Sequence, residues 1–168
     1  MTLDSLLSKY SRVRVATAED NEELLAFYAS SEMDATKISL SFDRSPNFFS
    51  LLNQQSEKFY VAKFVNDDES LGGVASFGLR TNYINGQPTS TAYLSDLRLS
   101  PNMSHESRRQ WREFYVDLLL HAHHFPELNH CRFFFSIILD ANKRAINALV
   151  KKNGPISYNE VTKYSTIS

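Results

Sequence analysis

Several features are scarce in this sequence, and each scarcity excludes a class of protein. With one cysteine, Cys131, the chain can form no internal disulfide, which favours a reducing compartment. A formal net charge of -1 argues against a general nucleic-acid-binding protein, because such proteins are usually basic. No apolar run approaches the ~20 residues that span a bilayer, and the N-terminal residues lack the basic region of a secretory signal. We therefore expect a cytoplasmic protein without nucleic-acid or membrane partners.

The remaining composition is typical of a globular domain. Hydrophobic residues make up 42% of the 168 residues and charged residues 22%, which is enough apolar material for one buried core. No internal repeat, low-complexity segment or linker divides the sequence. We therefore expect a single domain over residues 1–168.

The first part of the chain carries one strand pattern and two helix starts. Residues 12–16 alternate in hydrophobicity and predict a strand, and Thr17 followed by Asp20 is typical of a capped helix start. Ser45 before Pro46 predicts a second helix that begins at the proline. Between these two helices, residues 30–42 show no dominant period.

The middle of the chain predicts an antiparallel meander. Three segments have strand character, and they cover residues 59–65, 71–83 and 89–99. Between the last two, Asn85 and Gly86 both tolerate the positive φ of a tight hairpin turn. We therefore expect three neighbouring strands, of which the last two form a hairpin.

The last part of the chain alternates helix and strand patterns. Residues 107–124 have an apolar face at spacings of three and four, which predicts a long helix. Residues 133–139 are almost continuously apolar, as in a strand that is covered on both faces and has a parallel neighbour. Asp140 is then the expected cap of a last helix, ended by residues 153–155. Residues 156–167 predict a final strand.

The order of these elements, and three short segments, give the chain a recognisable family likeness. Residues 13–20 form an opening strand and capped helix, and residues 93–101 form a strand that leads into the long helix. Near the end, Asn142 and Ala145 match an Asn-x-x-Ala helix start. In these features the chain resembles the GNAT superfamily of N-acetyltransferases. The resemblance implies an α/β (α+β) fold with a mixed, mostly antiparallel sheet flanked by helices, its final strand missing or swapped.

The resemblance also implies an activity, a co-substrate and partners. GNAT proteins transfer an acetyl or other acyl group from acetyl-CoA or another acyl-CoA to an amine, which attacks the thioester directly. A backbone N–H on a splayed strand stabilises the oxyanion, and a loop with a helix N-terminus binds the pyrophosphate. The expected acceptor is a small-molecule or peptide amine. A final strand that stands at an exposed edge also suggests a homodimer through that strand.

The family pattern assigns candidate roles to individual residues. Asp96 is the candidate general base, with a structural role at a bulge or in an ion pair with Arg98 as the alternative. Tyr158 is the candidate acid for the leaving thiolate, and Tyr93 and Tyr164 are alternatives. Arg44 and Asn47 are candidates for the acceptor pocket, unless their segment only starts a helix. The candidates for binding the acyl-CoA follow the strand, the loop and the two later helices: Leu97 and Leu99 through backbone N–H groups, Ser104, Ser107, Arg108, Arg109 and Asn142.

Two departures from the family pattern leave other functions open. The expected phosphate-binding loop, residues 102–108, contains no glycine, so its side chains would crowd a bound phosphate. Leu149 occupies the position at which many members carry the tyrosine that acts as the acid. A degenerate member that binds a ligand or partner without chemistry is therefore one alternative. An acyltransferase that uses an acyl-carrier protein is another, since its loop need not grip the phosphates of coenzyme A.

A histidine cluster raises the question of a metal site. His121 and His124 share a helix face, and His130 lies close by in the sequence. No tight Cys/His spacing motif accompanies them, and a histidine near a helix C-terminus is favourable by itself. We therefore predict no metal site.

Overall fold

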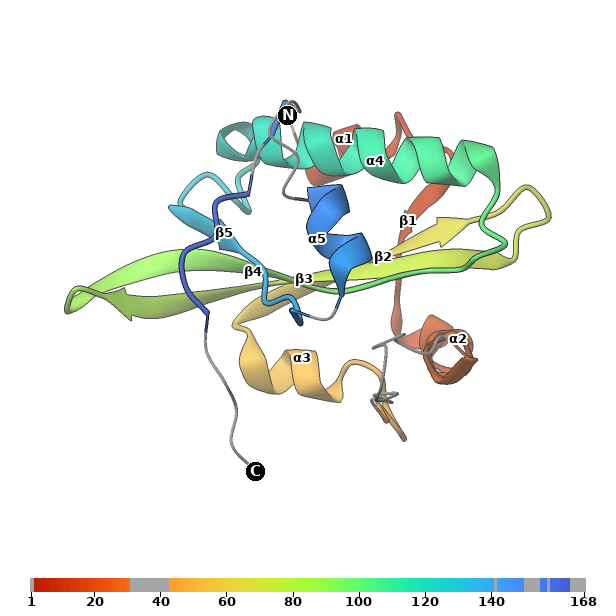
Figure 1. Ribbon diagram of the computed structural model, residues 1–168, viewed down its shortest axis with the longest axis horizontal. Helices are drawn as coiled ribbons and strands as arrows, with labels where there is room; N and C mark the ends of the chain where they lie inside the picture. The colour runs from red at the N-terminus through yellow and green to blue at the C-terminus, as the bar shows by residue number, and fades with distance from the viewer. Residues whose placement is uncertain (1, 31–42, 141, 150–154, 157, 164–168) are drawn as a thin grey trace.

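The computed structural model describes residues 2–30, 43–140, 142–149, 155–156 and 158–163. Its described strands form one sheet in the order β1-β2-β3-β4-β5 (Figure 1). Neighbours from β1 to β4 are antiparallel, whereas β4 and β5 are parallel. This mixed, mostly antiparallel sheet confirms the predicted fold class. The strands are β1 (Val13–Val15), β2 (Lys58–Val65), β3 (Leu71–Ile84), β4 (Gln87–Leu99) and β5 (Phe133–Phe135).

Helices cover both faces of the sheet (Figure 1). The helix α4 (His105–Leu120) lies with α1 (Leu3–Leu7) on one face, and α2 (Asn21–Ser30) lies with α3 (Ser50–Gln55) on the other. Each pair buries its own apolar cluster against the strands, and fully buried members include Leu6 and Phe125 on the α4 side and Leu24 and Phe48 on the α2 side. No helix in the described parts of the chain is long and apolar enough to cross a membrane.

The two predicted helix starts have different outcomes. Asp20 Oδ2 accepts a hydrogen bond of 2.7 Å from the N–H of Thr17, so the predicted cap is confirmed, and a short 3-10 turn, η1 (Ala18–Asp20), leads into α2. The helix predicted to begin at Pro46 is wrong in its start, because α3 begins at Ser50. Residues 45–49 form turns instead, and Phe48 donates its backbone N–H to Asn21 Oδ1 at 2.9 Å. The unassigned segment 31–42 lies outside the described residues.

The predicted hairpin is confirmed and is longer than its neighbours. Asn85 and Gly86 have φ values of 52° and 75°, as the tight turn requires. Strand β2 pairs with β3 only as far as Lys58 opposite Leu79. The rest of the β3–β4 hairpin therefore extends past β2 as a two-stranded arm, which projects from the body in Figure 1.

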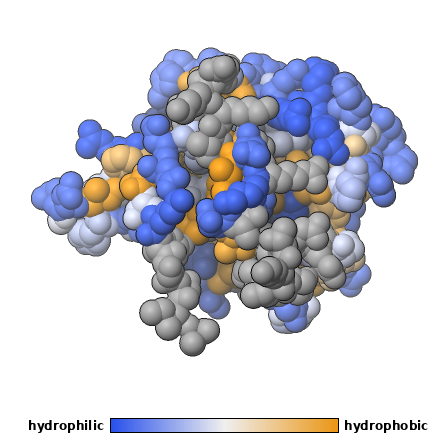
Figure 2. Space-filling model, viewed as in Figure 1, coloured by the Kyte–Doolittle hydropathy of each residue, from blue (hydrophilic) through white to orange (hydrophobic). Residues whose placement is uncertain are grey.

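The later elements are shorter than predicted. The long helix ends at Leu120 and is followed by a 3-10 turn, η2 (Ala122–His124). Strand β5 has the predicted parallel neighbour, but it ends at Phe135 rather than Leu139. The expectation of a strand covered on both faces is wrong in the described structure, because Phe133 is 49% and Ile137 54% exposed. Figure 2 shows hydrophobic surface around α5 (Lys143–Leu149), which follows this segment.

The start and end of the last helix also need correction. Asn142, not Asp140, caps α5, since its Oδ1 accepts the N–H of Ala145 at 3.0 Å. Asp140 instead pairs with Lys143 at 3.2 Å. Residues 155–156 and 158–163 contain no strand, so the predicted final strand is wrong over these residues. The predicted helix end at 153–154 and residues 157 and 164–168 lie outside the described residues, and the homodimer stays a prediction.

The buried ring of Phe125 tests the α4-side core. We expect Phe125→Ala to lower the free energy of unfolding by about 3–5 kcal/mol, because the side chain is fully buried and its loss leaves a cavity. Tyr83→Ala is the matched control. Its ring is 78% exposed on the projecting arm, so the change should stay within about 0.5 kcal/mol. Urea denaturation of both variants measures the difference, and equal losses would contradict the assignment of the core.

Candidate functional site

The two parallel strands of the sheet run together only briefly. Their register pairs are Thr91 with Phe133, Ala92 with Phe134 and Tyr93 with Phe135. Past Tyr93 the described ladder ends, although β4 continues to Leu99. Residues 94–99 therefore have no ladder partner on the β5 side in the described structure, and we call this the unpaired edge of β4. Such an edge presents backbone groups that a ligand can bind.

A β-bulge bends the strand within this unpaired edge. Ser95 pairs with Ser76 and Arg98 pairs with Val74, so Asp96 and Leu97 together oppose the single residue Ala75. Asp96 takes the left-handed conformation, with a φ of 57°. Bulges increase the local twist and re-aim side chains, and here the bulge lies just past the point where β4 and β5 part.

The side chain of Asp96 is held in a buried cluster. It is only 4% exposed, and its Oδ1 accepts hydrogen bonds from Arg44 Nη2 at 2.5 Å and from the hydroxyl of Tyr28 at 2.9 Å. The guanidinium of Arg98 lies 4.4 Å from the centroid of the Tyr28 ring. Burial, followed by the charge of Asp96, raises the pKa of Tyr28. The cluster thus joins α2, the turn before α3 and the bulge of β4 through one carboxylate.

At the N-terminus of α4, the polar groups of Ser104 and Ser107 already form hydrogen bonds within the protein. The hydroxyl of Ser104 accepts the N–H of Ser107 at 3.2 Å, and the N–H of Ser104 donates to Asn66 Oδ1 at 2.8 Å. The buried hydroxyl of Ser107 donates to the carbonyl of Val65. Each hydroxyl that sequence reasoning offered to a phosphate is therefore engaged within the protein.

Comparison with solved structures shows which known folds this structure resembles. No protein-family model matches the sequence, and no curated protein matches it. The structure, however, resembles an aminoglycoside 6'-N-acetyltransferase from Acinetobacter baumannii, with 14% identity, a TM-score of 0.54, and coverage of 93% of this chain and 98% of that one. A glucosamine-6-phosphate N-acetyltransferase from Arabidopsis thaliana gives 8% identity, a TM-score of 0.54, and coverage of 92% and 96%.

The chain has the GNAT fold. A third structure, a tetramutant of a protein from Bacillus halodurans, is similar over 92% of this chain and 99% of its own, with 18% identity and a TM-score of 0.57. The predicted likeness to GNAT proteins is therefore confirmed at the level of the fold.

Within the GNAT fold, the two arginines at the start of α4 differ in their availability. Arg109 forms ion pairs with Glu106 at 2.6 Å and Glu113 at 2.7 Å along the helix surface. The hydrogen bonds from Arg109 hold the pKa of Glu106 down at about 2. Arg108 makes only long contacts of 3.5 Å, to the carbonyls of Ser100 and Met103, and pairs with no carboxylate of the described residues. Of the two, Arg108 is the one with a guanidinium available to an anion.

The other acyl-CoA candidates are the backbone N–H groups of Leu97 and Leu99 and the amide side chain of Asn142. The N–H of Ser100 donates to the carbonyl of Gly72 on β3, at 2.8 Å. Because successive N–H groups of a strand point to opposite sides, the N–H of Leu99 points toward the unpaired edge. The side chain of Leu97 in the bulge is 38% exposed. Asn142, by contrast, uses its Oδ1 to cap α5.

The two acceptor-pocket candidates do not share one environment. Arg44 reaches Asp96 through the ion pair described above, so the structure joins a predicted acceptor residue to the predicted base. Asn47 is exposed, and its Oδ1 accepts the N–H of Phe49 at 2.9 Å, which closes a local turn. Sequence reasoning missed Tyr28, which lies on α2 and donates to the same carboxylate.

The candidate acid Tyr158 lies at the point where β4 and β5 part. Its hydroxyl contacts the hydroxyl of Tyr115 on α4 and lies 3.3 Å from Ser136 Oγ, just after β5. Ser136 in turn donates to the carbonyl of Leu94, at 2.9 Å. Sequence reasoning missed Tyr115 and Ser136. The signal for Ser136 is that it is the one polar residue within the apolar run 133–139.

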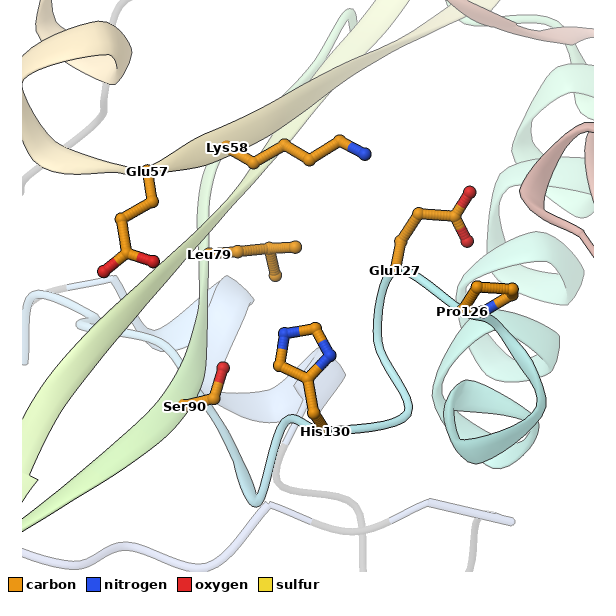
Figure 3. Close-up of a pocket in the computed structure, with 7 residues that line it drawn as sticks. All are labelled: Glu57, Lys58, Leu79, Ser90, Pro126, Glu127 and His130. Atoms are coloured by element: carbon orange, nitrogen blue, oxygen red, sulfur yellow. The ribbon is translucent and has the colours of Figure 1, made fainter.

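A separate pocket of about 410 Å³ opens at the other end of β4. In Figure 3, Lys58, Leu79 and His130 point into it, whereas Glu57 turns away and accepts the N–H of Thr81 at 2.9 Å. Strand β4 contributes Ser90 to this pocket, on the far side of the parallel ladder from Asp96.

Among the described residues, no group of three or more His, Cys, Asp or Glu side chains could hold a metal ion.

The Arg44–Asp96 ion pair can be tested by a double-mutant cycle. We expect Arg44→Met to destabilise the protein by about 3–5 kcal/mol, because it leaves a buried carboxylate without its cation. Asp96→Asn in the same chain should recover part of that loss. The matched control is the exposed pair Asp140–Lys143, with side chains 73% and 67% exposed, for which coupling should stay below about 1 kcal/mol. Equal coupling in both cycles, measured by urea denaturation, would contradict a structural role for the buried pair.

Proposed function

We propose that this protein is an N-acyltransferase that transfers an acetyl or other acyl group from an acyl-CoA to an amine. One observation carries the proposal: β4 separates from its parallel neighbour after Tyr93 while a bulge at Asp96 bends the strand that continues. The GNAT fold supports the same conclusion, since similar structures include acetyltransferases for an aminoglycoside and for glucosamine 6-phosphate.

In the proposed reaction, the amine attacks the thioester carbonyl directly. A carbon–nitrogen bond forms, and the carbonyl oxygen gains negative charge that a backbone N–H of the unpaired edge stabilises. We assign this role to Leu97 or Leu99. The carbon–sulfur bond then breaks and its electron pair stays on sulfur. A base removes the proton of the amine, and an acid protonates the thiolate.

Asp96 is our candidate base and Tyr158 our candidate acid. Arg44 and Tyr28 donate hydrogen bonds to Asp96 Oδ1, whereas Oδ2 is contacted by the hydroxyl of Ser95 at the longer distance of 3.5 Å. The second oxygen is therefore the one that an amine would approach. For the phosphates of the acyl-CoA we propose Arg108, whose guanidinium is not committed to a carboxylate of the described residues.

A second candidate function is a GNAT-fold domain that binds a ligand or partner without chemistry. The closed N-terminus of α4 favours it, because Ser104 and Ser107 satisfy each other and Val65 rather than facing outward. Titration calorimetry with acetyl-CoA, followed by a screen of amines for acyl transfer, separates the two. Binding with transfer supports the enzyme, binding without transfer supports the second candidate, and no heat at millimolar acetyl-CoA contradicts the proposed co-substrate.

The role of Asp96 has its own kinetic test. We expect Asp96→Asn to reduce turnover by about 10²- to 10⁴-fold, which is the usual contribution of a general base, with little change in affinity for acetyl-CoA. Asp140→Asn, which alters an exposed carboxylate, should change neither quantity. If Asp96→Asn abolishes acetyl-CoA binding instead, the lost turnover reflects only the structural role of Asp96, and another group must serve as the base.

A further inference from the structure

Three hydroxyl groups meet where β4 and β5 part, and they come from three separate segments. Tyr115 belongs to α4, Ser136 follows β5, and Tyr158 belongs to the C-terminal segment. Tyr158 contacts both others, and Ser136 Oγ donates to the carbonyl of Leu94 at 2.9 Å. Leu94 is the first residue of the unpaired edge, so this chain of hydroxyls ends on the backbone that we propose to bind the thioester.

The direction of the chain follows from counting protons. A backbone carbonyl can only accept, so the single hydroxyl proton of Ser136 goes to Leu94. Ser136 must then accept from Tyr158, and Tyr158, having given its own proton, must accept from Tyr115. The order of donation is therefore Tyr115 to Tyr158 to Ser136 to Leu94.

The surroundings of Tyr115 keep its hydroxyl protonated. Burial, and then the charge of Tyr158, raise the pKa of Tyr115 far above its ordinary value. Tyr115 is thus held as the neutral donor of the pair. A neutral donor that points at a phenol oxygen stabilises negative charge on that oxygen, which is what an acid needs after it has given up its proton.

We infer that Tyr115 and Ser136 are positioning residues that hold Tyr158 as the acid for the departing thiolate. This inference rests on the proposed function. When the carbon–sulfur bond breaks, the sulfur keeps the electron pair and takes the hydroxyl proton of Tyr158. The phenolate that results accepts hydrogen bonds from Tyr115 and from Ser136, whose hydroxyl turns away from Leu94. A proton from water restores Tyr158 after the products leave.

A purely structural role for the same contacts is the competing explanation. The hydroxyl pair would then only fasten the C-terminal segment to α4, and its loss would change stability without altering the ionisation of Tyr158. The two explanations therefore differ in a titration and in the separation of kcat from KM.

The first experiment is an NMR pH titration of protein labelled with ¹³C at tyrosine Cζ, in which Tyr158→Phe assigns the Tyr158 signal. Tyr115→Phe keeps the ring and removes only the donor, and it should move the midpoint of the Tyr158 titration upward by about one pH unit or more. Tyr83→Phe, on the exposed arm, is the control and should leave the midpoint unchanged. An unchanged midpoint in Tyr115→Phe overturns the inference.

The second experiment measures acyl transfer with acetyl-CoA and an accepted amine. Tyr158→Phe and Tyr115→Phe should each lower kcat at least tenfold, with KM for acetyl-CoA within about twofold, and Ser136→Thr should retain more activity than Ser136→Ala because it keeps the hydroxyl. A shifted midpoint with unchanged kcat overturns the positioning role. If the unsubstituted protein transfers no acyl group although Tyr115→Phe shifts the midpoint, the proposed function fails while the hydroxyl chain stands.

Discussion

The ion pair between Arg44 and Asp96 is the interaction on which the rest of the site depends. It lies inside the protein, with the two side chains 11% and 4% exposed, and it fixes the bulge of β4 to the turn before α3. Because the carboxylate also accepts a hydrogen bond from the hydroxyl of Tyr28, the same group connects α2 to the sheet. This bulge lies just past the point where β4 leaves its parallel neighbour, and β4 stays paired with β3 on both sides of the bulge.

The candidate site therefore has two groups of side chains along one strand. On the α2 side, the buried carboxylate of Asp96 accepts hydrogen bonds from Arg44 and Tyr28, and it is our proposed base for the amine. At the point of separation from β5, the hydroxyls of Tyr115, Ser136 and Tyr158 gather beside the carbonyl of Leu94. The unpaired edge runs between these two groups. The proposed base and backbone donor thus lie on β4 and the proposed acid lies beside it, an order that suits direct transfer between two substrates.

Hydrophobic periodicity predicted most of the fold, because long strands and a strongly amphipathic helix carry a clear signal. The turn residues Asn85 and Gly86 predicted the hairpin, because only a few residue types accept a positive φ. The capping signal at Ser45 and Pro46 misplaced the start of α3, since this turn is fixed by contacts with α2 that no local pattern shows. Pairing of Arg44 with Asp96 was likewise not predictable, because the two residues are far apart in the sequence and neither has a distinctive neighbour.

The central claim is that the unpaired edge of β4 receives the acyl thioester. The most direct test is an amide NMR titration of the ¹⁵N-labelled protein with acetyl-CoA. We expect the N–H signals of Leu97 and Leu99 to shift with saturation, while that of Thr81, near the separate pocket, stays in place. Saturable binding that leaves the signals of residues 94–99 unchanged would contradict the account.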